Sequence, residues 1–222
     1  MADYIIQGQT LTDIADAIRA KTGGSAAMTP VEMPDEIASI QSGGEALNWL
    51  LDYIGGTLSG DVVFPAEVTQ IKSAHPQGWN FYSNNAITAV TIPNTVEVFS
   101  TSRFQNLGNL TKVTISMSAT SAPTDFFYSC SRLEIVEITE DCGLLSLSNY
   151  FFENLSALHT VIIRPNRLIT MSASTSVRNC TNFGSGGTGK FYVPDSLVDN
   201  YKTATNWSSW ASFINPLSDL PT

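Results

Sequence analysis

The chain of 222 residues is poor in charged residues and especially in basic ones, and it lacks any long apolar run. Only 14% of the residues are charged, and 20 acidic residues against 11 basic ones give a net charge of −9. Nucleic-acid binding needs clustered Lys and Arg to displace counterions, so this balance argues against a nucleic-acid partner. A membrane-spanning helix needs about 18 or more consecutive apolar residues, and no segment approaches that length. We therefore expect neither nucleic-acid binding nor membrane insertion.

Signatures of catalysis are also missing. His75 and His159 are the only histidines, and the sequence contains no HExxH, CxxC pair or Gly-x-Ser-x-Gly. The run from Gly184 to Gly189 is not followed by Lys-Ser/Thr, so it predicts a loop and not a phosphate-binding turn. The adjacent Glu140 and Asp141 could act in glycoside hydrolysis, but such pairs on loops are usually solvated. We expect no enzyme activity, no metal and no cofactor.

The first residues carry neither a basic region nor an apolar stretch, so they do not predict a signal peptide. This feature favours a protein that is made in the cytoplasm of a host cell without export.

What the chain does contain is an internal repeat. A pattern that begins with Phe and continues with apolar residues at fixed steps starts at Phe81, Phe104, Phe127 and Phe152, with a degraded copy at Val177. The steps between copies are 23, 23, 25 and 25 residues. Repeats of this length predict a solenoid, in which each unit buries its apolar face against its neighbours. We therefore predict an α+β, β-rich fold, a right-handed solenoid of about five coils with terminal caps.

Two spacings alternate within a repeat. The step of three from Phe104 to Leu107 to Leu110 predicts a tight helical turn, whereas Val113 and Ile115 are two apart, as in a β-strand. Short polar residues follow the leading position in register and are expected to satisfy backbone groups of the turn: Ser83, Asn106, Ser129, Asn154 and Asn179.

The cysteines are expected to be structural. Cys130 and Cys180 take a repeat position that leucine takes in other copies, two coils apart. At about 4.8 Å per coil they would be separated by roughly 10 Å, beyond the ~7 Å limit for a disulfide. We expect these two residues and Cys142 to be buried, unpaired and without a redox role.

The chain divides into two domains. Residues 1–44 predict two short helices that are too small to form a core alone, and their apolar positions are candidates for attachment or oligomerisation: Leu11, Ile14, Ile18, Val31, Met33, Ile37 and Ile40. Residues 45–222 form the predicted solenoid. Within it, residues 45–80 are a cap with a half-repeat, residues 81–190 are the repeats, and residues 191–222 are a second cap. This second cap is expected to contain a helix through Tyr201 and to bury Trp207 and Trp210.

The repeat pattern Phe-x-Asn/Ser-Cys/Leu-x-x-Leu-x-x-Val-x-Ile, as in residues 127–138, resembles the BspA-like leucine-rich repeats of bacterial and phage surface proteins. Residues 191–202 are similar to the segment that commonly ends such arrays. Residues 8–23 resemble the N-terminal module of tail-associated proteins from phages of Gram-positive bacteria. These resemblances imply a leucine-rich-repeat-type solenoid that serves adhesion, host recognition or virion display.

Our functional hypothesis is a phage virion protein, a tail-fibre-like or displayed component. The resemblances imply that the N-terminal module binds other virion proteins, as a homo-oligomer with a trimer among the candidate states, and that the solenoid binds a host-surface protein or glycan. The alternative is a bacterial surface adhesin or protein-interaction module, which would require an export signal and an anchor.

A binding solenoid should use the strand residues that alternate with the buried Val and Ile. Together with Ala89, they are Thr91, Lys112, Thr114, Ile135, Glu137, Thr160 and Ile162. Ile135 and Ile162 are expected to be exposed and to form an apolar patch for a partner. The competing interpretation is an ordinary solvated sheet face.

Overall fold

The computed structural model of the protein describes residues 49, 52, 57–66, 68–71, 81–99 and 104–221. The predicted helical attachment module at residues 1–44 lies outside these residues, as does most of the first predicted cap.

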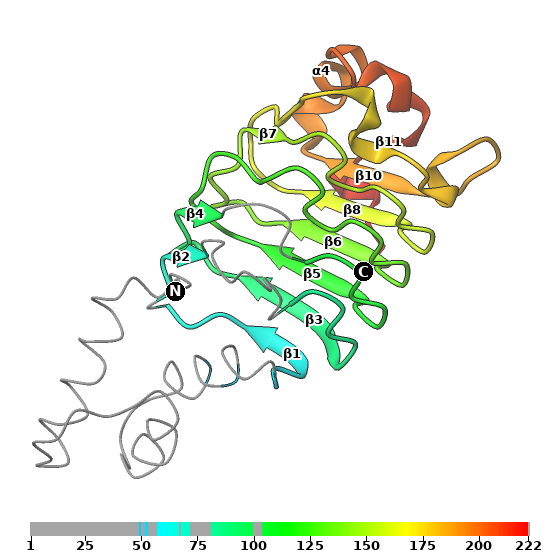
Figure 1. Cartoon of the computed structure of the whole chain (residues 1–222). Coiled ribbons are helices and arrows are strands. Elements are labelled where there is room, and N and C mark those ends of the chain that lie inside the picture. Colours follow the sequence, from blue (N-terminus) through cyan, green and yellow to red (C-terminus); the bar gives the residue numbers. More distant parts are fainter. Residues whose placement is uncertain are drawn as a thin grey trace, which may run out of the picture.

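Within the described residues, the main element is a parallel sheet with the strand order β1-β3-β5-β6-β8-β10-β11 (Figure 1). Successive coils of the chain each contribute one strand, and the strands have the following bounds: β1 Gly60–Val63, β3 Ile87–Ile92, β5 Lys112–Ile115, β6 Ile135–Ile138, β8 Thr160–Ile163, β10 Lys190–Val193 and β11 Ile214–Pro216. The β-rich parallel arrangement with few helices confirms the predicted repeat architecture.

A second set of short strands lies on another side of the coils (Figure 1). β2 (Gln70–Ile71) pairs with β4 (Val98–Phe99), and β7 (Ser146–Leu147) pairs with β9 (Thr170–Met171), all in parallel. In the main sheet, Val62 of β1 is in register with Val90 of β3. The segment predicted as a half-repeat therefore contributes strand β1 beside β3.

The core contains a file of phenylalanines that runs along the stack. Phe64, Phe81, Phe104 and Phe127 have successive ring-centroid distances of 5.5, 4.8 and 5.7 Å. All four side chains are almost completely buried. The coils thus supply rings to a continuous apolar interior, as the repeat spacing predicts, and the later coils supply two each, Phe126 with Phe127 and Phe151 with Phe152.

The predicted helical turn after the leading Phe is wrong for the regular copies. In the third copy, the Cys130 N–H donates to Phe127 O and the Leu133 N–H donates to Cys130 O, which makes two successive turns. Ser129 has φ 59°, and the equivalent residues share this left-handed conformation: Ser83, Asn106, Asn154 and Asn179. A residue in the left-handed region cannot continue a right-handed helix. The short 3₁₀ helix η1 (Ser174–Val177) leads into the degraded fifth copy, and η2 (Thr181–Phe183) lies within it.

The polar residues at these left-handed positions connect neighbouring coils. The backbone N–H groups of the first four donate to the following coil, as the Ser129 N–H does to Glu153 O at 3.1 Å and the Asn154 N–H does to Arg178 O at 3.0 Å. The Asn179 side chain also donates to Asn154 Oδ1 at 2.9 Å. The side chains of Asn154 and Asn179 therefore link their coils, and Asn is favoured because it tolerates positive φ.

The C-terminal cap contains the predicted helix, here α4 (Val198–Thr203), which follows η3 (Asp195–Leu197) (Figure 1). Trp207 is fully buried and its Nε1–H donates to Ile169 O at 2.8 Å, whereas Trp210 is half-buried. The segment then continues through η4 (Ser208–Phe213), β11 and η5 (Leu217–Asp219). Strand β11 was not predicted; it pairs with β10 and covers that edge of the sheet.

The three cysteines are unpaired and buried, as expected. The thiols of Cys130 and Cys180 donate to Phe104 O and Phe152 O of the preceding coil. Burial raises the pKa of each of these two thiols to about 12.

None of the helices in the described segments has the length and apolarity needed to cross a bilayer.

Candidate binding face

The candidate binding residues lie in two rows across the main sheet. One row pairs Ala89, Lys112, Ile135 and Thr160 on successive strands, and the other pairs Thr91, Thr114, Glu137 and Ile162. We call these eight residues the outer sheet face. Within each row, the residues of neighbouring strands are in register.

The outer sheet face is accessible over β3, β5 and β6. Lys112 is exposed there, and Thr91, Thr114, Ile135 and Glu137 are half-buried. The residues between them in sequence, such as Val113 and Val136, are fully buried in the core. Because neighbouring strands lie about 4.8 Å apart, side chains in each row are close enough to contact one ligand together.

The prediction of an exposed Ile162 is wrong. Ile162 is only 7% exposed, because its cross-strand neighbours on the same side of the sheet are Glu137 on β6 and Tyr192 on β10. Tyr192 is itself only 8% exposed. Arg164, two residues after Ile162, reaches back to Glu137 with 2.5 Å between Arg164 Nε and Glu137 Oε1. The predicted apolar patch of Ile135 and Ile162 is therefore absent from the outer sheet face, and only Ile135 is partly accessible.

The sequence analysis missed the effect of Tyr192 on the exposure of Ile162 and the ion pair of Arg164 with Glu137. Their signal was available in the spacing, because Arg164 lies two residues beyond Ile162 and therefore on the same side of the strand. The effect of Tyr192 could be inferred only by aligning β10, which lies outside the regular copies, with the strands of the repeats. The structure gives this alignment, because Tyr192 is in register with Ile162.

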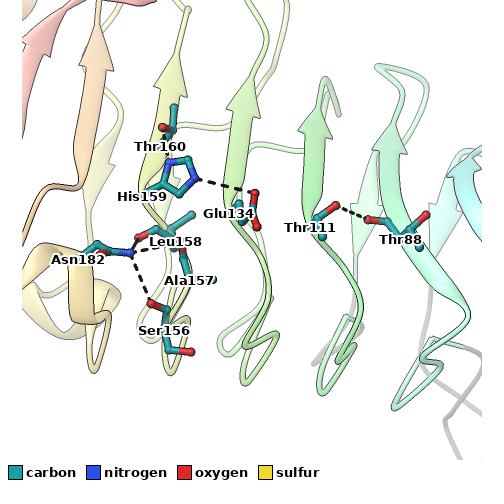
Figure 2. Close-up of polar contacts among 9 residues, drawn as sticks. All are labelled: Thr88, Thr111, Glu134, Ser156, Ala157, Leu158, His159, Thr160 and Asn182. Carbon is teal, nitrogen blue, oxygen red and sulfur yellow. Dashed lines mark hydrogen bonds and ion pairs between the residues drawn. The ribbon is translucent and has the colours of Figure 1, made fainter.

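Polar contacts line the amino-terminal ends of the strands (Figure 2). The Thr111 hydroxyl donates to Thr88 O at 3.1 Å, and the Glu134 N–H donates to Thr111 O at 2.9 Å. One strand further on, His159 Nε2 lies 4.0 Å from Glu134 Oε2, and His159 Nδ1 lies 2.9 Å from Thr160 Oγ1. His159 is exposed at its strand start, as predicted. An exposed pair of this kind contributes at most about 1 kcal/mol, so it positions side chains more than it stabilises the fold.

Asn182 extends this margin into the fifth copy. Its Nδ2 lies 3.5, 3.4 and 3.2 Å from the carbonyl oxygens of Ser156, Ala157 and Leu158 (Figure 2). The side chain thus caps backbone acceptors at the turn of the preceding coil. It keeps the irregular fifth copy in place beside β8.

The comparisons with known proteins agree with this geometry. Residues 77–185 match the family described as "BspA type Leucine rich repeat region", in six copies. The chain contains a BspA-type leucine-rich repeat region. Repeats of this type suggest a protein-interaction or adhesion module. No curated protein matches the chain.

Two solved structures are similar to this chain. A leucine-rich repeat protein from Bacteroides ovatus is 18% identical over 72% of this chain and 45% of its own, with a TM-score of 0.42. A leucine-rich repeat protein from Eubacterium ventriosum is 19% identical over 56% of this chain and 44% of its own, with a TM-score of 0.37. The chain therefore spans less than half the length of each.

Side chains of the BspA-type repeats that could carry chemistry, such as Asp141, take part in contacts within the fold. In the described segments, no three His, Cys, Asp or Glu side chains form a group that could hold a metal ion. Asp141 accepts a hydrogen bond from the Thr139 hydroxyl at 2.5 Å and another from Asn94 Nδ2 at 3.1 Å. These bonds tie the Asp141 carboxylate to its own coil and to the coil that contains Asn94, and Glu140 beside it is exposed.

Proposed function

We propose that the protein is a binding module whose outer sheet face contacts a protein or glycan on another surface. The observation that carries this proposal is the alignment of the outward residues of β3, β5, β6 and β8 in two continuous rows. Repeats of the BspA type suggest an interaction or adhesion role, which agrees with this placement. We propose a binding role and not a catalytic one, because the carboxylates and thiols described above serve the coils themselves.

The chemistry of the outer sheet face suits a polar ligand. Thr91 and Thr114 offer hydroxyl groups that both donate and accept hydrogen bonds, and Lys112 adds a positive charge. Lys112 has no ion-pair partner among the described residues, whereas Glu137 is paired with Arg164. Because these side chains stand on a hydrogen-bonded sheet, little backbone conformational entropy is lost when a ligand binds.

We further propose that this module belongs to a phage virion, as a tail-fibre-like or displayed component. The support is the resemblance of residues 8–23 to the N-terminal module of tail-associated proteins from phages of Gram-positive bacteria. In this setting residues 1–44 would attach the protein to other virion proteins as a homo-oligomer, with a trimer among the candidate states. The repeats alone equally favour a bacterial surface adhesin, so that function remains the second candidate.

Binding by the full chain to Gram-positive cells and to purified cell wall tests the binding role. Lys112→Glu and Thr114→Arg on the outer sheet face should abolish binding. The control Leu145→Lys changes a side chain that is 50% exposed and lies off this face, and it should bind normally. Absence of binding by the full chain, or full binding by both face variants, would refute the proposal.

The proposed place in a phage virion has its own test. Mass spectrometry of purified phage particles should detect the chain if it is a virion component, and light scattering should give an oligomeric mass. Detection in the cell-wall fraction of growing cells, but not in particles, would instead establish the adhesin.

A further inference from the structure

An open hollow of about 460 Å³ lies at the C-terminal end of the sheet, between the glycine-rich loop and η4. Lys190 lines it and is in register with Thr160 of β8, so the hollow continues one row of the outer sheet face. Its volume falls within the range of small-molecule sites, about 300–1,000 Å³. The remaining lining comes from three segments. They are Phe183 of η2, residues 184–187 of the glycine-rich loop, and Ser209, Ser212 and Phe213 of η4.

The glycine-rich loop is a defined wall of this hollow. The Gly187 N–H donates to Gly184 O at 2.9 Å, and the Gly189 N–H donates to Asn182 O at 2.8 Å. A Cβ atom on Gly187 would lie 2.2 Å from Asn182 O, and Gly186 has φ 76°. The loop therefore requires glycine for a close approach and for a left-handed turn, and both features hold it against η2.

Several donors around the hollow are not used by the protein. Among the described residues, no hydrogen bond is made by the backbone N–H groups of Ser185 and Gly186 or by the hydroxyls of Ser209 and Ser212. The Lys190 ammonium likewise has no ion-pair partner within the described segments. A cation that lines a hollow without a carboxylate partner is available to an anionic ligand, even in a chain with a net charge of −9.

The hollow also has an aromatic side. Phe183 is buried and Phe213 is half-buried, with 5.5 Å between their ring centroids. The half-buried Phe213 thus stands among lining residues that are mainly glycine and serine. It offers an apolar surface for the C–H face of a sugar ring.

We propose that this hollow binds an acidic sugar unit, one that carries a carboxylate or a phosphate. Lys190 meets the anionic group, the hydroxyls of Ser209 and Ser212 meet the sugar hydroxyls, and Phe213 supports the ring. The inference rests on the proposed binding function and narrows its ligand to an acidic glycan.

Backbone amide NMR of the full chain, titrated with glucuronate, glucose 6-phosphate, glucose and inorganic phosphate, tests this site. Glucuronate, glucose 6-phosphate or both should shift the signals of Ser185, Gly186 and Lys190, and the responding sugar identifies the anionic group. Glucose should shift them far less at equal concentration. Equal binding of inorganic phosphate and glucose 6-phosphate would overturn the sugar assignment, and the absence of any shift in the hollow would overturn the site.

Variants separate the site from the rest of the surface. Lys190→Met should weaken binding of the acidic sugar about tenfold or more, the loss expected for one charge-assisted hydrogen bond. Ser212→Trp should fill the hollow and abolish binding, while Lys202→Met on α4 should bind as the unaltered chain does. Unchanged affinity in Lys190→Met would overturn the proposal. Lys112→Glu should leave sugar binding intact, so this inference can fail while adhesion through the outer sheet face is retained.

Discussion

Arg164 forms an ion pair with Glu137 of the neighbouring strand β6, with 2.5 Å between Arg164 Nε and Glu137 Oε1. Glu137 is the cross-strand neighbour of Ile162, which lies two residues before Arg164. The pair thus borders the isoleucine that the repeat pattern predicted to be exposed. It also neutralises the one carboxylate of the outer sheet face, so that Lys112 determines the charge of this surface.

Loss of the Arg164 charge should change stability little. The Arg164 side chain is 41% exposed and that of Glu137 is 21% exposed, and solvent-accessible pairs contribute about 1 kcal/mol or less. Arg164→Met, which keeps the apolar stem, should therefore lower the free energy of unfolding by less than about 1 kcal/mol in urea titration. Glu137→Gln is the matched control, and a loss well above this range in either variant would show that the pair is a major stabilising contact.

Truncation of the phenylalanine file should be severe. Phe127 is fully buried and stacks on Phe104, so Phe127→Ala should lower the free energy of unfolding by about 3–5 kcal/mol through the cavity it leaves. Leu145→Ala, at an exposed position, should stay within about 0.5 kcal/mol. Similar losses in the two variants would contradict a continuous core along the stack.

Stability should depend on which side chain occupies the left-handed turn position of Ser129. Ser129 has φ 59°, and a residue with a Cβ costs about 1–2 kcal/mol in that conformation, most of all when it is β-branched. Ser129→Val should therefore destabilise the chain by at least about 1 kcal/mol, whereas Ser129→Asn should retain or raise stability. The control is Ser131→Val, two residues further on, where φ is negative. Equal thermal midpoints for the two valine variants would refute this explanation of the turn.

The buried thiols should make stability fall at alkaline pH. Burial raises the pKa of the Cys130 and Cys180 thiols from 9.0 to about 12, so above pH 9 the unfolded chain loses these protons before the folded chain does. The contribution of each thiol to the free energy of unfolding is complete below pH 9. It declines as pH rises toward 12, by about 1.4 kcal/mol per thiol and pH unit.

A urea titration at pH 8 and pH 10.5 measures this effect. The double variant Cys130→Ala/Cys180→Ala should be less stable at pH 8 but should lose less stability on going to pH 10.5. An identical loss in both chains would show that other groups cause the alkaline destabilisation.

The Tyr201 hydroxyl should stabilise the C-terminal cap. It accepts the Ile169 N–H at 2.9 Å and donates to Arg167 O at 3.2 Å, and the ring is fully buried. Tyr201→Phe leaves the buried Ile169 N–H without a partner, which should cost about 1–3 kcal/mol of unfolding free energy. The hydroxyl of Tyr192 makes no hydrogen bond within the described part of the chain, so Tyr192→Phe should be nearly neutral. A neutral Tyr201→Phe would show that water replaces the lost hydroxyl.

The strand register could be predicted because each copy repeats the same alternation of inward and outward residues. Thr114 falls beside Glu137 as soon as Val113 is aligned with Val136. The turn could not be predicted, because a step of three suits both a 3₁₀ turn and two successive β-turns. Only the backbone angle at residues such as Ser129 distinguishes the two conformations.

The candidate sites were only partly predictable for a similar reason. Exposure of Ile162 depends on the side chains that neighbouring strands place beside it, and Tyr192 comes from a strand outside the regular copies. The hollow at Lys190 is built from the glycine-rich loop and η4, which are brought together by β11. Pro216 at the end of β11 gave no reason to expect a strand there, since proline cannot donate to a sheet.

The spacing of the repeats alone determined the parallel stack, the inward columns and the outward rows, because copies of near-equal length bury equivalent residues only when they lie one above another. Tertiary structure alone decided which outward residues reach solvent and where a hollow opens. Those outcomes depend on contacts between segments with no common repeat, such as Phe183 of η2 with Phe213 of η4, and local spacing contains no information about such contacts.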